Sequence, residues 1–90
     1  MRHYFAPQFD KMYRKLPEND QSQVDRATQA FLSYLVERKD LPKGLGLKRL
    51  TKQYWEIRAS IDLRIVIELD DPIGFLLVGN HDDIRRFIRE

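Results

Sequence analysis

The sequence predicts an α+β domain in which a helical hairpin packs on one face of a small, mainly antiparallel sheet and a short helix ends the chain. Three observations support this prediction. Apolar residues recur at helical spacing in the first part of the chain, they alternate with polar residues from Leu47 onward, and a short amphipathic segment follows. Because ninety residues bury enough apolar surface for one core and too little for two, residues 1–90 are expected to form a single domain.

A short strand and a first helix are expected at the beginning. Residues 2–5 are mostly aromatic, which suits an edge strand. Pro7 suits the first turn of a helix, where a missing N–H costs nothing, and Pro17 disfavours helical geometry at the residue before it. The apolar stripe between the two prolines has i, i+3, i+4, i+7 spacing and consists of Phe9, Met12, Tyr13 and Leu16.

A second helix is expected from Asp20 to about Lys39. The Asp20 carboxylate can accept hydrogen bonds from the first turn, and Gln23 stands three residues later, as in a capping box. Its apolar face consists of Val24, Ala27, Phe31, Tyr34 and Leu35. Two glycines and a proline within residues 41–46 then predict a loop.

Three strands and a closing helix are expected in the remainder. In residues 54–59 and 62–69, apolar and polar side chains alternate, so each strand should have one core face and one polar face. A turn at residues 70–72 precedes residues 73–80, which are apolar on both faces, as expected of a strand inside the sheet. Residues 82–90 begin with acidic side chains and end with arginines, which matches a helix dipole.

Composition limits the possible functions. The chain has no cysteine and two histidines, so neither a disulfide framework nor a zinc site is expected, and no nucleotide-cofactor motif occurs. No segment suggests a secretory signal or a membrane span, which favours the cytoplasm. The net charge of +2 hides an asymmetry, because residues 1–52 carry +5 and residues 53–90 carry −3. Such a basic half can attract phosphates, although a solvated surface explains it equally well.

Five motifs in this order resemble the RelE/ParE-like toxins over nearly the whole chain. The motifs are KLP (15–17), LKRL (47–50), YWEIR (54–58), RIVI (64–67) and VGNHDD (78–83). The resemblance implies a toxin of a type II toxin–antitoxin pair that a small cognate antitoxin neutralises. RelE-like members cut mRNA, often on the ribosome, whereas ParE-like members poison DNA gyrase and cut nothing. A degenerate member that only binds its antitoxin is a third possibility.

The resemblance assigns the catalytic roles to Arg64 and His81. Arg64 stands where RelE-like toxins carry a phosphate-stabilising arginine, and His81 stands where the family uses histidine or arginine. If Arg58 pairs with Arg64, and Arg64 with Gly79, all three lie on one face and His81 is a diagonal neighbour of Arg64. An imidazole titrates at about pH 6.5, so it can transfer protons in either direction. Alternatively, His81 merely leads into the last helix.

Basic and aromatic residues near these two could hold RNA. The resemblance implies phosphate contacts for Lys48 and Arg49, with Lys52 as a third candidate; a solvated strand edge is the alternative. Arg58 could hold RNA or form an ion pair with Glu56. Tyr54 could stack on a base, whereas Trp55 is expected in the core.

One feature departs from the family pattern. RelE-like toxins often carry a tyrosine four to six residues after the histidine position, where this chain has Arg85, Arg86 and Phe87. Either His81 transfers protons alone, or the protein is a weak nuclease or none. The expected function is therefore a metal-independent endoribonuclease that needs no cofactor and acts on mRNA, with gyrase inhibition as the chief alternative.

Overall fold

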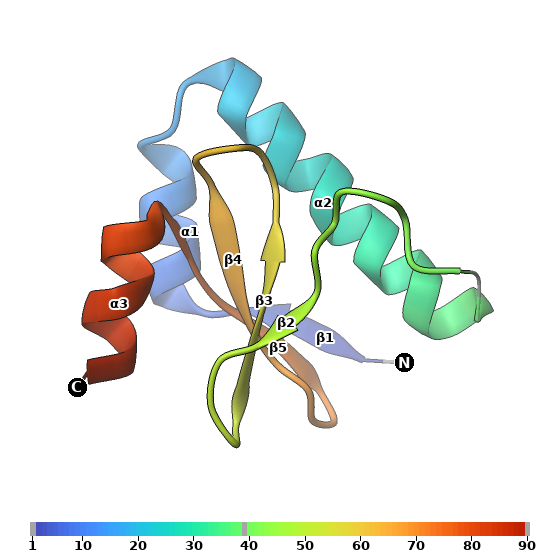
Figure 1. The fold of residues 1–90 in the computed structure, drawn as a ribbon. Coiled ribbons are helices and arrows are strands. Elements are labelled where there is room, and N and C mark those ends of the chain that lie inside the picture. Colours follow the sequence, from blue (N-terminus) through green and yellow to red (C-terminus); the bar gives the residue numbers. More distant parts are fainter. Residues whose placement is uncertain (1, 39, 90) are drawn as a thin grey trace.

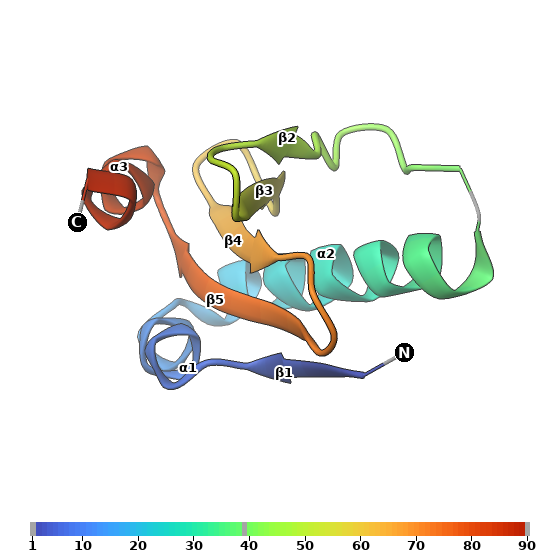
Figure 2. The ribbon, with the colours of Figure 1, turned by 90° about the horizontal axis from the view of Figure 1, so that it is seen from below.

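A five-stranded sheet with the strand order β1-β5-β4-β3-β2 forms the centre of the fold (Figures 1 and 2). The computed structural model describes residues 2–38 and 40–89. Along the chain the elements are β1 (His3–Phe5), α1 (Pro7–Arg14), α2 (Glu18–Glu37), β2 (Lys48–Arg49), β3 (Tyr54–Arg58), β4 (Arg64–Glu68), β5 (Ile73–Gly79) and α3 (His81–Arg89). The predicted α+β class, the helical hairpin and the closing helix are confirmed.

The helices differ from the prediction at their ends. Helix α2 begins at Glu18 with Pro17 as its N-cap, so the predicted cap, Asp20, lies inside the first turn, where its charge still favours the helix dipole. At the other end α2 stops at Glu37, followed by Arg38 with a left-handed φ of 56°. Lys39, the predicted end, lies outside the described residues, as does Glu90 at the predicted end of the last helix.

A tyrosine joins the two helices of the hairpin. The Tyr13 hydroxyl donates a hydrogen bond to Asp25 Oδ1 at 2.8 Å, and this bond, with burial and the carboxylate charge, raises the pKa of Tyr13. Gln21 Nε2 donates to the Tyr13 carbonyl at 3.0 Å. Although α2 has 20 residues, no helix in the described part of the chain is long and apolar enough to cross a membrane.

The sheet is antiparallel except at one edge. Strand β1 pairs in parallel with β5, while β2, β3, β4 and β5 pair antiparallel in succession. Strand β5 therefore lies inside the sheet, as its two apolar faces predicted. The two-residue strand β2 was not predicted as a separate strand, because a segment this short shows no alternation of its own.

The inner face of the sheet, which α1 and α2 cover, carries the main core. Phe75 of β5 is fully buried there and packs against Phe5, Phe9 and Phe31, with ring centroids 4.9 to 6.4 Å apart. Phe31 comes from α2 and Phe9 from α1, so one β5 side chain joins both helices to the sheet.

The opposite, outer face is partly apolar as well. Val66 was expected on a polar face, yet it is fully buried with Leu77 and with Ile84 of α3. Val66 is buried because α3 packs over this part of the outer face, a tertiary contact that the strand's own alternation does not show. Trp55, expected in the core, is only partly buried at the sheet edge, where the Arg49 guanidinium lies 5.6 Å from its ring centre.

Replacing Phe75 with alanine tests this core. We expect Phe75→Ala to lower the free energy of unfolding by about 3 to 5 kcal/mol, because the lost side chain leaves a cavity between both helices and the sheet. Urea denaturation followed by circular dichroism measures the change. A loss below about 1 kcal/mol would show that α1 and α2 are held to the sheet by other contacts.

Candidate functional site

The predicted strand register around Arg64 is confirmed. Arg58 lies opposite Arg64 across β3 and β4, and Arg64 lies opposite Gly79 across β4 and β5. Residues directly opposite each other project from the same face of a sheet, and both arginines therefore project from the outer face. The diagonal position expected for His81 required the same ladder to continue two residues beyond Gly79. That detail is wrong, since the ladder ends at Gly79 and His81 is the first residue of α3.

Arg64 and His81 nevertheless share one pocket. It has a volume of about 210 Å³ and is lined by Ile61, Asp62, Arg64, Asn80, His81 and Asp82. The β3–β4 turn supplies one wall and the first turn of α3 supplies the other. The pocket thus brings a guanidinium and an imidazole together, with the carboxylates of Asp62 and Asp82 in the same lining.

Arg64 is held in position from one side. Its Nε lies 3.4 Å from Glu56 Oε2, and its Nη1 donates to the carbonyl oxygens of Ser60 and Ile61, each at 3.4 Å. The side chains of Arg64 and Glu56 are only 20% and 15% exposed. The ion pair and the two long hydrogen bonds hold the guanidinium beside Glu56 and the β3–β4 turn.

Glu56 is the functional candidate that the sequence reasoning missed. It was noted on the same polar face and considered as a partner of Arg58, but its carboxylate pairs with Arg64. Among the described residues Arg58 makes no ion pair and is exposed. The strand register carried the signal, because Glu56 lies opposite Val66, two residues from Arg64, and is thus a diagonal neighbour of that arginine.

A reciprocal cap places His81. Asn80 Oδ1 accepts a hydrogen bond from the Asp83 backbone N–H, and Asp83 Oδ2 accepts one from the Asn80 N–H, both at 2.9 Å. These two reciprocal hydrogen bonds are arranged as in a capping box, and they fix the start of α3 at His81. A Cβ at Gly79 would come within 2.5 Å of Asp83 Oδ2, so a residue without a side chain precedes the cap.

The predicted RNA-binding residues divide between the two faces. Lys48 lies opposite Glu56 and so shares the outer face with Arg58 and Arg64, whereas Arg49 lies opposite Trp55 on the other face. The Arg49 guanidinium also donates to the carbonyl oxygens of Thr51 and Lys52, each at 3.0 Å. Arg49 is thus committed to shaping the β2–β3 loop, and Lys52 is exposed in that loop.

Tyr54 stands farther from the pocket. It lies on the outer face at the opposite end of β3 from Arg58, and its ring packs edge-on against Phe87 of α3 with centroids 5.1 Å apart. Because this contact and α3 occupy part of its surface, the ring is partly buried rather than an open stacking platform.

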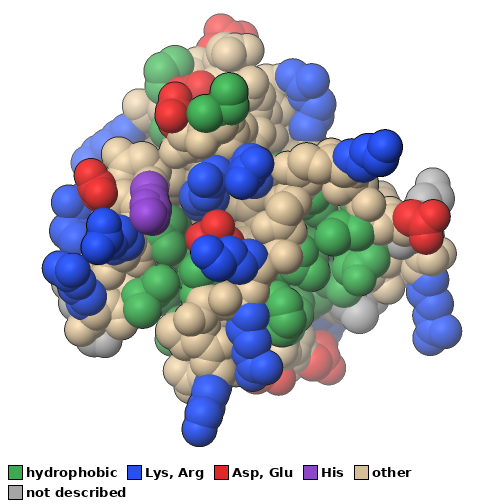
Figure 3. Space-filling view, viewed as in Figure 1, with side chains coloured by type: hydrophobic (Ala, Val, Ile, Leu, Met, Phe, Trp, Pro, Cys, Tyr) green, Lys and Arg blue, Asp and Glu red, His purple; other side chains and the backbone are tan. Residues whose placement is uncertain are grey.

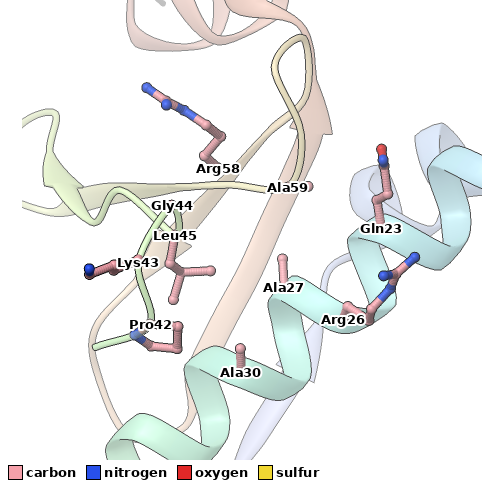
Figure 4. Close-up of a pocket in the computed structure, with 10 residues that line it drawn as sticks. All are labelled: Gln23, Arg26, Ala27, Ala30, Pro42, Lys43, Gly44, Leu45, Arg58 and Ala59. Atoms are coloured by element: carbon pink, nitrogen blue, oxygen red, sulfur yellow. The ribbon is translucent and has the colours of Figure 1, made fainter. Parts of the chain in front are cut away.

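A separate hollow lies between α2 and the loop before β2 (Figure 4). It has a volume of about 310 Å³, and Ala27, Ala30 and Leu45 form its floor. Figure 4 shows the Arg58 side chain directed away from α2, although Arg58 borders this hollow. Arg58 therefore belongs with the outer face. The described residues include no group of three acidic, histidine or cysteine side chains placed to hold a metal ion.

The fold is that of the RelE-like toxins. YafQ from E. coli superposes with a TM-score of 0.65 at 17% identity, over 93% of this chain and 98% of YafQ. RelE in the RelB–RelE complex from Methanococcus jannaschii superposes with a TM-score of 0.64 at 23% identity, over 92% of this chain and 95% of RelE. YoeB from Staphylococcus aureus superposes with a TM-score of 0.64 at 23% identity, over 90% of this chain and 97% of YoeB. No family model and no curated protein matches the sequence.

Removing the helix cap tests how His81 is positioned. We expect Asn80→Ala to lower the free energy of unfolding by about 1 kcal/mol and to speed amide hydrogen exchange at Asp83, whose N–H loses its acceptor. Asn80→Asp keeps an acceptor and serves as the control. Unchanged exchange at Asp83 in Asn80→Ala would show that packing alone fixes the helix start.

Proposed function

We propose that this protein is the toxin of a type II toxin–antitoxin pair and acts as a metal-independent endoribonuclease that cleaves mRNA. The observation that carries the proposal is the pocket shared by Arg64 and His81 on a RelE-like fold. A second observation supports it. Arg58 and Arg64 stand directly opposite each other on the outer face, and Glu56 pairs with Arg64 alone, so among the described residues Arg58 keeps a positive charge without an ion-pair partner beside Arg64.

The chemistry needs only the RNA and these side chains. The 2′-hydroxyl of the RNA attacks the adjacent phosphorus and gives up its proton, the bond from phosphorus to the 5′-oxygen breaks, and that oxygen takes up a proton; one of the two protons passes through His81 and the other is exchanged with solvent water. The products are a 2′,3′-cyclic phosphate and a 5′-hydroxyl end. Arg64 stabilises the added negative charge on the phosphate, and Glu56 holds its side chain at the pocket.

His81 transfers a proton in this reaction. It stands on the β5 side of Arg64 at the mouth of the same pocket, so its imidazole can reach an oxygen of a phosphate that Arg64 holds. Lys48 and Arg58, on the same face, hold the RNA strand through its phosphates. Arg49 and Tyr54 contribute less, because Arg49 is committed to the β2–β3 loop and Tyr54 packs on Phe87 of α3. Lys52, exposed in that loop, is a third phosphate contact.

The partners follow from the same proposal. The solved relatives include complexes of RelE with RelB, of YafQ with DinJ and of YoeB with YefM. A cognate antitoxin is accordingly the proposed protein partner of this chain. Its RNA target is mRNA, with cleavage on the ribosome in the cytoplasm.

Mapping RNA ends in cells tests the function. We expect induction of the wild-type protein to arrest growth and to create new transcript 5′ ends, and we expect Arg64→Ala and His81→Ala each to reduce these cuts at least 100-fold, the scale of a lost catalytic group. His3→Ala is the matched control, since His3 lies on β1 at the far edge of the sheet.

Two results would contradict the proposal. Growth arrest without new 5′ ends, together with inhibited supercoiling, would indicate a gyrase inhibitor. Equal cutting by wild-type and His81→Ala protein would remove His81 from the chemistry.

A further inference from the structure

Helix α3 carries three arginines that the reaction above does not use. Arg85, Arg86 and Arg89 alternate along this helix with Ile84, Phe87 and Ile88, which pack on the outer face of the sheet. The sequence alone places all three arginines on a solvent-facing helix. All three line one pocket together with Asp82, and Arg86 in addition borders a second groove.

Arg86 faces α1 and already has a partner. It forms an ion pair with Asp83 one turn earlier. Both residues border a groove of about 410 Å³ whose other walls come from Gln8 and Met12 of α1 and from Leu77 and Phe87. Arg86 therefore lies on the flank of α3 that is turned away from Arg64.

Arg85 and Arg89 lie on the other flank, in line with His81. Each of these residues follows the previous one by four positions. At about 100° and about 1.5 Å per residue, consecutive members are offset by about 40° around the helix and by about 6 Å along it, so they lie on neighbouring parts of one helix face. Both arginines are exposed, and within the described part of the chain neither forms an ion pair. His81, at the start of this line, shares a pocket with Arg64, which projects from the same outer face as Arg58 and Lys48.

We propose that Arg85 and Arg89 bind the phosphates of the RNA strand that follow the phosphate held by Arg64 and His81. The proposal rests on the function proposed above and extends that site along α3. The strand would run between cations of the sheet on one side and cations of the helix on the other. Figure 3 shows Lys and Arg side chains gathered over both regions, with a histidine between them.

Spacing and chemistry favour an RNA backbone as the occupant. A line of cations that begins at the reactive pocket continues the path of a strand whose phosphate is already bound there. Arginine forks bind phosphates in two-point contacts, and such contacts position a strand without selecting its bases. We therefore assign to α3 a role in strand affinity rather than in base choice.

Salt-dependent RNA binding tests this assignment. The probe is a short single-stranded RNA with 2′-O-methyl groups throughout, which lacks the attacking hydroxyl and stays intact. Two phosphate contacts contribute about −1.4 to the slope of log affinity against log salt. Fluorescence anisotropy should thus show a slope smaller in magnitude by about 1.4 for the variant Arg85→Ala/Arg89→Ala and, at 0.1 M salt, an affinity about 25-fold lower.

The control removes the same charge elsewhere. Arg2→Ala/Arg26→Ala also lowers the net charge by two, but Arg2 adjoins the edge strand β1 and Arg26 lies on α2, which covers the inner face. We expect this variant to keep the wild-type slope. Circular dichroism checks that both variants are folded, which we expect because all four arginines are exposed.

The outcomes separate this inference from the proposed function. An unchanged slope in Arg85→Ala/Arg89→Ala, an equal loss in the control, or no binding of the probe by the wild type would overturn the α3 assignment. If transcripts are still cut in cells and the cuts require Arg64 and His81, the nuclease proposal survives that failure. Absence of cutting by the wild type would remove the nuclease proposal itself.

Discussion

The antiparallel pairing of β4 with its two neighbours is the constraint on which the candidate site depends. It sets Arg64 opposite Arg58 on one side and opposite Gly79 on the other. Side chains of a strand alternate between faces, so a slip of one residue would turn Arg64 toward the core and bring Ile65 to the surface. Burial of Ile57, Ile65 and Val78 on the inner face therefore fixes the arginines on the outer face.

An irregularity in the same pairing lies in the middle of β4 and β5. Between Val66 and Ile67 the register with β5 shifts by one residue, so that Ile67 pairs with Phe75. The shift leaves the Arg64–Gly79 pair in place and lets β5 present Phe75 to the main core. A bulge of this kind increases local twist, and main-core residues lie on both sides of it, among them Ile65 and Phe75.

Much of the fold was predictable because its signals are local. The prolines at 7 and 17, the apolar stripe of α1 and the alternation around Arg64 each specify an element within a few residues. The register around Arg64 could be predicted from the turns at Ile61 and Asp71, but the shift between Val66 and Ile67 could not, because the alternation of side chains carries no sign of it. Burial of Val66, the partial exposure of Trp55 and the packing of Tyr54 on Phe87 could not be predicted, because each depends on where distant elements pack. The same holds for the ion pair between Glu56 and Arg64, which required the register and a choice among several cations.

The chemical nature of the cut ends tests the central claim, that Arg64 and His81 act on one phosphate through the 2′-hydroxyl of the RNA. Purified protein should be incubated with ribosome-bound mRNA, and the 3′ ends of the fragments identified by mass spectrometry. A 2′,3′-cyclic phosphate or its hydrolysed monophosphate, paired with a 5′-hydroxyl on the downstream fragment, is the predicted result. Fragments with a 3′-hydroxyl and a 5′-phosphate would contradict the claim, because water rather than the 2′-oxygen would then have attacked the phosphorus.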